Sequence, residues 1–330
     1  MNKIKLTANI LFAGVGMQER GIENSGLFDL DVVTTSEIDK HAILSYAAVH
    51  HGLTKEQIDE EYANAKVGIE LDNDFYVDYL TTRKIGYDFQ KRKMPNWSRC
   101  KAKELYMYYR ACELNHNVGD IASVTELPYA DLWTYSFPCT DLSISGNQAG
   151  MHKGLTRSGL VYEVTRLLEV ALNKGNPPKY LLMENVDALV SKKFKPTFDA
   201  LVEWFDEHGY NTYWQILNAK DHGVPQNRKR VFALHIRKDV DNGKFTFPKP
   251  YDNGIRLRDI LDKNVDEKYY LSKEVQNRFQ PSDNLDSNVI GSTAPPFRTI
   301  GQRDVVYNTQ KIVGATCATD YKQPKQIQEK

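Results

Sequence analysis

The segment KIKLTANILFAGVGMQER, residues 3–20, contains the pattern that decides the fold. Residues 3–12 have the pattern of a strand, residues 13–16 form a turn with two glycines, and residues 17–25 have the pattern of a helix that stops at Gly26. Glycines at a strand-to-helix turn let the backbone approach a ligand, and the helix N-terminus offers unpaired N–H groups. The segment therefore predicts the first strand–turn–helix unit of an α/β domain with a mostly parallel sheet.

The same alternation of strand and helix patterns continues along most of the chain. A second strand is expected at residues 31–36 and a second helix at residues 40–51. Further strands are predicted at residues 132–137, 180–184, 213–217 and 231–236, and further helices at residues 158–173 and 195–208. From about Pro248 the strand patterns become short, and the loops contain Pro-Pro and clusters of Ser, Asn and Asp. We therefore expect a first domain over residues 1–247 and a smaller second domain over residues 248–330.

The composition is typical of a folded protein. The 330 residues are 41% hydrophobic and 26% charged, which excludes a disordered chain, and no apolar run is long enough for a membrane span. Lys+Arg and Asp+Glu both number 43, so a field that attracts nucleic acid must come from local patches. Cys100, Cys112, Cys139 and Cys317 form no C-x-x-C pair, which favours a reducing, cytoplasmic environment. Cys100, Cys112 and His116 match no standard zinc spacing, so no metal site is predicted.

A segment of unusual charge separates the second helix from Asp120. From Thr54 to Leu80 there are eight acidic residues against two basic ones, and from Thr81 to Lys103 eight basic residues against one acidic one. Three aromatic residues interleave the basic part, and such a mixture can hold a phosphate backbone and stack on bases. An inserted lobe whose two halves neutralise each other explains the pattern equally well. The role of the insert, residues 54–117, therefore stays open.

Two acidic residues, one after the second expected strand and one ahead of the third, lie at positions suited to an adenosine-bearing ligand. Glu37 lies about twenty residues after the glycine turn, where nucleotide-binding folds place an acid for ribose hydroxyls. Asp120, in Gly119-Asp120-Ile121, is placed to add an acid for an adenine amino group. The turn with Gly14 and Gly16 lacks the full G-x-G-x-x-G run of dinucleotide sites. This difference favours a mononucleoside such as S-adenosylmethionine.

The segment SFPCTDLS, residues 136–143, directly follows an expected strand. In parallel sheets the edge at the C-terminal ends of the strands forms the ligand crevice. Pro138 and the polar residues after Cys139 argue against a thiol buried as a small hydrophobe, so Cys139 is a candidate nucleophile. Glu184 ends the strand at residues 180–184 on the same edge. A carboxyl partly withdrawn from water can hold a proton at neutral pH, although an ordinary strand-end Glu is the alternative.

Cations gather just before the expected strand at residues 231–236. The segment Gln226-Asn-Arg-Lys-Arg230 contains three successive cations, and Lys220 to Asp259 has ten basic residues against five acidic ones. Arginine forks suit phosphates and base edges. A local excess of positive charge on a neutral chain indicates a nucleic-acid contact, with a solvated charged loop as the alternative.

Six segments in this order resemble the cytosine-C5 DNA methyltransferases. They are Phe12-Ala-Gly-Val-Gly16, Ser36-Glu-Ile-Asp39, Gly119-Asp-Ile121, Phe137-Pro-Cys-Thr-Asp-Leu-Ser143, Met183-Glu-Asn-Val186 and Gln226-Asn-Arg-Lys-Arg230. The resemblance implies a Rossmann-like methyltransferase domain that uses S-adenosylmethionine, joined to a small, irregular target-recognition domain. It also implies methyl transfer to C5 of a flipped-out cytosine in a specific sequence of double-stranded DNA, in restriction–modification or phage self-protection.

The resemblance further implies roles for individual residues. The Cys139 thiolate would attack C6 of cytosine, Glu184 would act on N3, and Arg228 and Arg230 would hold the base carbonyl and nearby phosphates, with Arg230 the better match to the family's arginine. The residues expected around the cofactor are Phe12, Gly14, Gly16, Glu37, Ile38, Asp120, Ile121, Pro138 and Leu160. Those expected at the DNA are Ser143, Gln226, Arg228, Lys229 and Arg230.

Two departures from the family pattern leave alternatives open. The charged insert is longer than compact members need. The family continues after the recognition domain into two further blocks, whereas this sequence stops at Lys330, with Thr316-Cys317 near the usual Thr-Leu. We therefore expect a second polypeptide that carries those blocks, or a longer enzyme of which this chain is part. A transfer RNA methyltransferase and a DNA-binding subunit that is inactive without a partner remain alternative functions.

Overall fold

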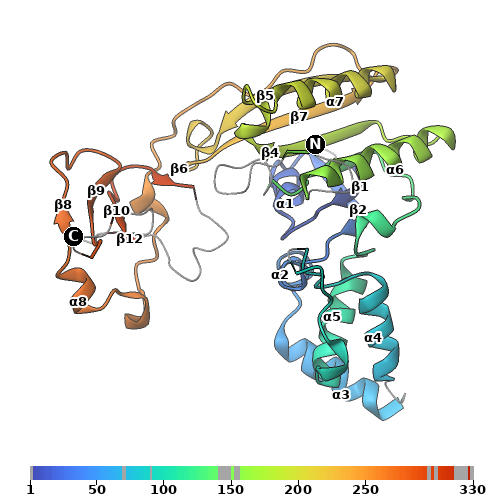
Figure 1. Ribbon diagram of the computed structural model, residues 1–330, viewed down its shortest axis with the longest axis horizontal. Helices are drawn as coiled ribbons and strands as arrows, with labels where there is room; N and C mark the ends of the chain where they lie inside the picture. Colours follow the sequence, from blue (N-terminus) through green and yellow to red (C-terminus); the bar gives the residue numbers. More distant parts are fainter. Residues whose placement is uncertain are drawn as a thin grey trace. The chain divides into compact units, whose positions relative to one another are not determined.

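The computed structural model describes residues 3–68, 72–89, 91–139, 150–151, 157–295, 299–300, 304–315 and 326–327. The chain divides into two compact units (Figure 1). Unit 1 consists of Met1–Gln215 and Val231–Phe245, and unit 2 consists of Ile216–Arg230 and Thr246–Lys330. The second stretch of unit 2 begins two residues before the boundary expected at residue 248. Residues 216–230, expected in the first domain, belong to unit 2.

A six-stranded sheet organises unit 1, with strand order β2-β1-β3-β4-β7-β5. Its strands are β1 (Ile4–Leu11), β2 (Phe28–Ser36), β3 (Leu132–Tyr135), β4 (Tyr180–Val186), β5 (Tyr210–Asn218) and β7 (Lys229–Arg237). β1 pairs in parallel with β2 and β3, and β3 pairs in parallel with β4. The α/β fold class and the mostly parallel sheet are therefore confirmed for this part of the chain.

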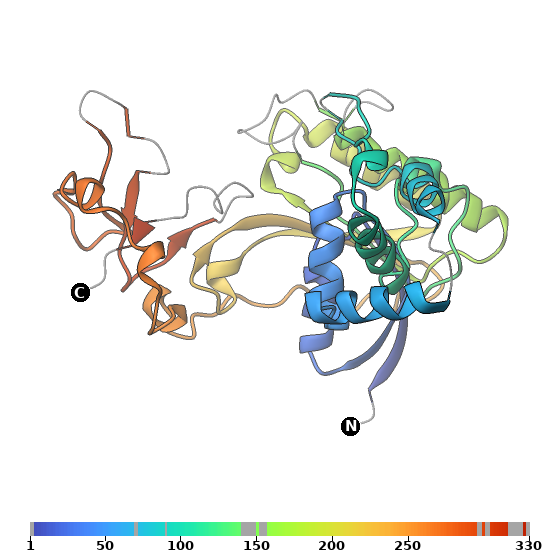
Figure 2. The ribbon, with the colours of Figure 1, turned by 90° about the horizontal axis from the view of Figure 1, so that it is seen from below.

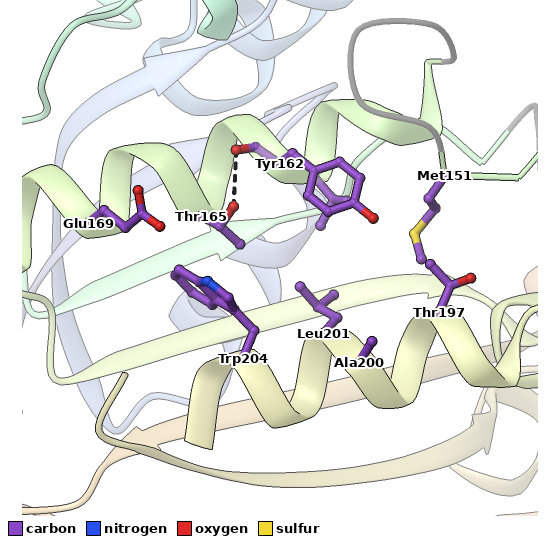
Figure 3. A pocket seen from close by; sticks show the side chains of 9 residues that line it. Met151, Tyr162, Thr165, Glu169, Thr197, Ala200, Leu201 and Trp204 are labelled. Atoms are coloured by element: carbon purple, nitrogen blue, oxygen red, sulfur yellow. Dashed lines mark hydrogen bonds between the residues drawn. The ribbon is translucent and has the colours of Figure 1, made fainter. Parts of the chain in front are cut away.

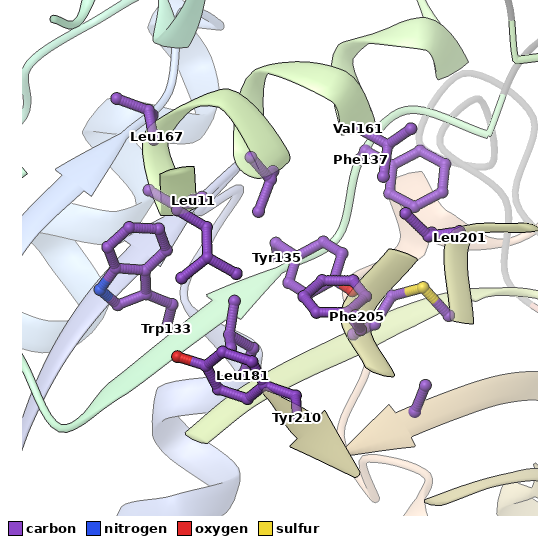
Figure 4. Packing of buried hydrophobic residues seen from close by; sticks show 14 of the residues in the cluster. Leu11, Trp133, Tyr135, Phe137, Val161, Leu167, Leu181, Leu201, Phe205 and Tyr210 are labelled. Carbon is purple, nitrogen blue, oxygen red and sulfur yellow. The ribbon is translucent and has the colours of Figure 1, made fainter. Parts of the chain in front are cut away.

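Helices cover both faces of this sheet because side chains alternate along its strands. Leu11 and Trp133 lie in the core beneath α6 and α7, whereas Ile10 and Leu132 lie on the other face with Ile22 of α1. Figure 4 shows the packing of the first of these cores. The helices are α1 (Met17–Asn24), α2 (Lys40–His51), α6 (Val161–Asn173) and α7 (Lys195–Glu207), with short 3-10 helices η2 (Ile121–Ser123), η3 (Ser158–Leu160) and η4 (Asp187–Val190).

The charged insert folds into helices that pack on α2 (Figures 1 and 2). They are α3 (Lys55–Gly68), α4 (Asn73–Thr82), η1 (Trp97–Arg99) and α5 (Ala102–Leu114). Their core is aromatic: Trp97 and Tyr108 are buried in it, together with Ile43 and Ala47 of α2. The sequence predicted no helix here. This separate aromatic core stabilises the insert. The many charged residues in the same segment obscured it in the sequence.

Unit 2 has short elements, as the sequence predicted for its larger part. Its strands form one sheet in the order β12-β10-β9-β8 and a pair β11-β6. They are β6 (Gln226–Asn227), β8 (Gln280–Pro281), β9 (Val289–Ser292), β10 (Val305–Tyr307), β11 (Val313–Gly314) and β12 (Gln326–Ile327). The helices are η5 (Ala219–Asp221), η6 (Leu257–Ile260), η7 (Glu267–Tyr269) and α8 (Lys273–Gln276). Across the described residues of both units, no helix is long and apolar enough to cross a membrane.

Candidate active site

The turn between β1 and α1 depends on its glycines. Gly14 and Gly16 have φ angles of 57° and 77°, and Phe12 just before them is also left-handed, at 59°. A Cβ on Gly16 would lie 2.1 Å from Nε2 of His50, so a side chain there would have to displace the His50 ring as well as adopt a strained backbone. Gly16 is also the N-terminal cap residue of α1 and offers no side-chain hydrogen bond. The first turn of α1 therefore begins without a side-chain cap, as in turns that receive nucleotides.

The carboxylate of Glu37 is held by three backbone donors. Its Oε2 accepts a hydrogen bond from the N–H of Gly14 at 2.9 Å, and its Oε1 accepts from the N–H groups of Ile38 and Asp39, both at 2.8 Å. Burial raises the pKa of this carboxyl, although the three hydrogen bonds act in the opposite direction. The structure thus brings Glu37 and Ile38 together with the glycine turn.

Asn117 joins the segment of Glu37 to that of Asp120, a connection that sequence reasoning missed. The buried Asn117 accepts hydrogen bonds at Oδ1 from the N–H groups of Glu37 (2.9 Å) and Gly119 (3.2 Å). Its Nδ2 donates to the carbonyl of Glu37 at 2.9 Å. The available signal was an Asn two residues before a Gly, a pattern typical of a turn in which the side chain bonds the backbone.

Asp120 is buried and has two partners of different kinds. Its Oδ1 accepts from the N–H of Ala122 at 3.1 Å, which caps η2 and places Ile121 in the core. Its Oδ2 accepts from Nζ of Lys84 at 2.6 Å. Lys84 belongs to the insert, and the sequence identified it only as one member of a basic run.

Cys139 follows β3, and two other segments hold the backbone before it. The chain leaves β3 through Phe137 and Pro138 to Cys139, which is half-buried. Nδ2 of Asn185 donates to the carbonyl of Phe137 at 3.0 Å, and Oγ of Ser158 donates to the carbonyl of Pro138 at 2.7 Å. The sequence assigned no role to Asn185 or to the hydroxyl of Ser158.

Glu184 lies on the strand next to the one that leads to Cys139. β3 and β4 are parallel, with Tyr135 opposite Met183. Glu184 follows Met183 directly, and Cys139 lies four residues after Tyr135, so the two residues share the edge at the C-terminal ends of the strands. Leu160, at the end of η3, packs against the core beneath this edge.

The expected DNA-contacting cations belong to unit 2. The N–H of Arg228 donates to Oδ1 of Asn218 at 2.9 Å, and the guanidinium of Arg230 donates to the carbonyl of Lys229 at 2.7 Å. Gln226 begins β6, which pairs in parallel with β11. Ser143, Thr316 and Cys317 lie outside the described residues.

A pocket of about 240 Å³ lies between α6 and α7 (Figure 3). Tyr162, Thr165 and Glu169 line it from α6, and Leu201 and Trp204 line it from α7. Among the residues that the structure describes, none of the predicted site residues lines this pocket. It belongs to the helical layer over the sheet.

The fold and this sheet edge define the class of protein. A parallel sheet with a glycine turn after β1, an acid after β2 and a Pro-Cys segment after β3 makes unit 1 a Rossmann-like methyltransferase domain. A family model described as C-5 cytosine-specific DNA methylase matches residues 90–329.

Two curated relatives agree with this match. The type II methyltransferase M2.ScrFI of Lactococcus lactis subsp. cremoris is 37% identical over 265 residues, which cover 79% of this chain and 68% of that protein. The orphan methyltransferase M.SssI of Spiroplasma monobiae is 30% identical over 314 residues, which cover 93% of this chain and 78% of that protein. The chain therefore belongs to the family of C-5 cytosine-specific DNA methylases, and it is a DNA cytosine-5-methyltransferase. Among solved structures, the S. pombe Dnmt2 methyltransferase is 17% identical, with a TM-score of 0.46 over 84% of this chain and 67% of that one.

Proposed function

We propose that the chain transfers a methyl group from S-adenosylmethionine to C5 of a flipped-out cytosine in a specific double-stranded DNA sequence, through a covalent bond between Cys139 and C6. The observation that carries this proposal is that hydrogen bonds from two other segments hold the backbone directly before Cys139. Asn185 and Ser158 fix the carbonyls of Phe137 and Pro138, directly before the thiol. A nucleophile held by neighbouring elements attacks at a lower entropic cost than a mobile one.

The residues at the sheet edge fit the cofactor. Glu37 offers a carboxylate to ribose hydroxyls, Asp120 offers one to the adenine amino group, and the turn with Gly14 and Gly16 permits close approach of the backbone. Further contacts are assigned to Phe12, Ile38, Ile121, Pro138 and Leu160. When bound, S-adenosylmethionine supplies the electrophilic methyl group that C5 receives.

The protein's own groups act on the cytosine ring. The Cys139 thiolate forms the S–C6 bond, and the electron pair of the C5–C6 double bond makes C5 nucleophilic. Glu184 donates a proton or a hydrogen bond to N3, which makes C6 more electrophilic. Arg230 holds the base carbonyl, and Arg228 holds nearby phosphate. After C5 gains the methyl group, a base removes the C5 proton, the double bond re-forms, and the S–C6 bond breaks to release the thiolate.

The setting that we propose is restriction–modification or phage self-protection in the cytoplasm of a bacterial cell. It is supported by the type II and orphan methyltransferases among the relatives. The second polypeptide expected from the sequence has no support from the structure or from these relatives, and we do not include it in the proposal.

Replacement of the nucleophile tests the mechanism. Cys139→Ser should abolish methylation of duplex DNA and leave binding of S-adenosylhomocysteine and DNA nearly unchanged, because only the covalent step needs a thiolate. Cys100→Ser, at a half-buried thiol in the insert, is the matched control and should remain active. A duplex with 5-fluorocytosine at the target should trap the wild type covalently, because fluorine does not leave C5 as a proton does.

The target sequence is found by bisulfite sequencing of DNA from cells that express the chain. Transfer RNA in the same methylation assay tests the RNA-directed alternative. Turnover by Cys139→Ser, or methylation of transfer RNA in place of DNA, would contradict the proposal.

A further inference from the structure

The turn that follows α4 contacts the segment assigned to the adenine ring. This turn comprises residues 83–86, and Lys84 within it has a left-handed φ of 54°. Nζ of Lys84 lies 2.6 Å from Oδ2 of Asp120. The lysine side chain is 44% exposed and the aspartate side chain 8% exposed, so a solvated cation meets a nearly buried carboxylate.

Backbone contacts fix the same turn on both sides of the candidate cofactor site. The N–H of Asp120 donates to the carbonyl of Arg83 at 3.0 Å, and the N–H of Gly86 donates to the carbonyl of Ile38 at 2.6 Å. A Cβ on Gly119 would lie 2.2 Å from the carbonyl oxygen of Arg83, so the backbones of these two segments are in direct contact. The ion pair is therefore built into the packing of the insert.

The hydrogen-bonding capacity of Asp120 leaves room for an outside donor. Its Oδ1 accepts from the N–H of Ala122 and its Oδ2 from Lys84, while a carboxylate has about four lone-pair positions. Arg83 does not compete for this carboxylate, because its guanidinium stacks on the ring of Tyr79 with its carbon 3.6 Å from the centroid. Lys84 offsets the cost of burying the charge and restricts the side chain to one orientation.

We propose that Lys84 is a positioning residue for the cofactor, which holds the Asp120 carboxylate so that it accepts the adenine amino group. The insert, residues 54–117, is then a working part of the cofactor site. This inference rests on the proposed use of S-adenosylmethionine. The basic part of the insert, which contains Lys84, then contributes to cofactor binding and not to contact with DNA.

Binding of S-adenosylhomocysteine to the full chain tests the inference by calorimetry. Lys84→Met should weaken binding roughly tenfold, because the carboxylate loses its charge-assisted partner and its orientation. The kcat at saturating cofactor should stay within about twofold, so the effect appears in the KM for the cofactor. Lys84→Arg should restore most of the affinity. Lys91→Met is the matched control: this 77% exposed lysine of the same lobe forms a salt bridge with Asp88 at 3.5 Å, and its loss should change neither quantity.

A second ligand separates positioning from a general loss of structure. S-inosylhomocysteine carries a 6-oxo group in place of the amino group, so the wild type should prefer the adenosyl ligand, and Lys84→Met should narrow that preference. If Lys84→Met fails to fold, Lys84→Gln is measured in the same way, with a smaller expected loss. Unchanged affinity and unchanged preference in a folded variant would overturn the role of Lys84. A wild type that binds neither ligand would instead contradict the proposed cofactor.

Discussion

Ser158 donates its hydroxyl hydrogen to the carbonyl of Pro138, one residue before the nucleophile. The side chain is fully buried at the start of η3, and Leu160 two residues later packs against the main core. A single side chain thus connects the helical layer to the backbone that carries Cys139. Hydrogen bonds of this kind add little net stability, but they restrict where a reactive group can lie.

Ser158→Ala should lower the single-turnover rate of DNA methylation by about tenfold, because the thiol is held less firmly in its attacking position. The free energy of unfolding should fall by about 1 kcal/mol. Thr165→Val is the control, since the Thr165 hydroxyl donates to the carbonyl of Tyr162 within its own helix. Rates within twofold of the wild type for Ser158→Ala, measured by rapid quench with saturating cofactor, would count against this role.

Helix α1 buries an acidic residue against α2. Glu19, in the first turn of α1, is 1% exposed and lies near Tyr46, whose ring stacks on His50 with centroids 4.3 Å apart. Burial raises the pKa of the Glu19 carboxyl to about 7. The folded protein therefore holds this proton up to a higher pH than the unfolded chain does. Its contribution to stability is complete below the ordinary pKa of 4.5 and is lost as the pH rises to about 7.

Glu19→Gln should remove this pH dependence, because the amide stays neutral at every pH. Between pH 5.5 and pH 8 the free energy of unfolding of the wild type should fall by about 2 kcal/mol relative to the variant. Urea unfolding at both pH values measures the difference. Burial lowers the pKa of His235 to about 3. The contribution of this residue to the free energy of unfolding therefore increases as the pH rises, opposite to that of Glu19. The wild type and Glu19→Gln share the His235 effect, so it cancels in the difference between their free energies of unfolding. An equal change in the free energy of unfolding with pH for both proteins would contradict the assignment to Glu19.

Over the whole molecule, acidic and basic residues are equal in number, and some of those in the insert pair with one another. Lys103 forms a salt bridge with Asp59, and Arg110 forms one with Glu61 at 2.8 Å. Both pairs join an acidic residue of α3 to a basic residue of α5. Lys229 of unit 2, in contrast, is exposed and follows the expected DNA-contacting Arg228.

The salt dependence of DNA affinity should therefore come mainly from unit 2. Simultaneous Lys91→Met, Arg92→Met and Lys93→Met should leave the slope of log Kd against log salt unchanged. Lys229→Met should lower it by about 0.9, the value of one phosphate contact. Fluorescence anisotropy over a range of about 50 to 200 mM salt gives these slopes. A fall of two or more in the triple variant would mean that the insert contacts DNA.

The amino-acid sequence by itself determined the strands of the six-stranded sheet, the helices that cover it and the order of its chemical groups. The helix expected at residues 40–51 is α2, and the helix expected at residues 158–173 is η3 followed by α6. The strand expected at residues 213–217 is longer, Tyr210–Asn218. These predictions succeed because alternation along a strand and the helical repeat are local properties that follow from which face is buried. The motifs that mark the edge of the sheet are equally local.

Only the tertiary structure decided which groups support that edge. Asn117 bonds Glu37 across 80 residues, Lys84 pairs with Asp120 across 36, and Ser158 reaches Pro138 across 20. The helices of the insert likewise depend on an aromatic core shared with α2. A charged or amide side chain in a loop could form a hydrogen bond or ion pair with many residues of the sequence, and the sequence does not show which one. The packing of distant elements selects one of them, because it brings that donor and acceptor within about 3 Å and excludes water from the rest.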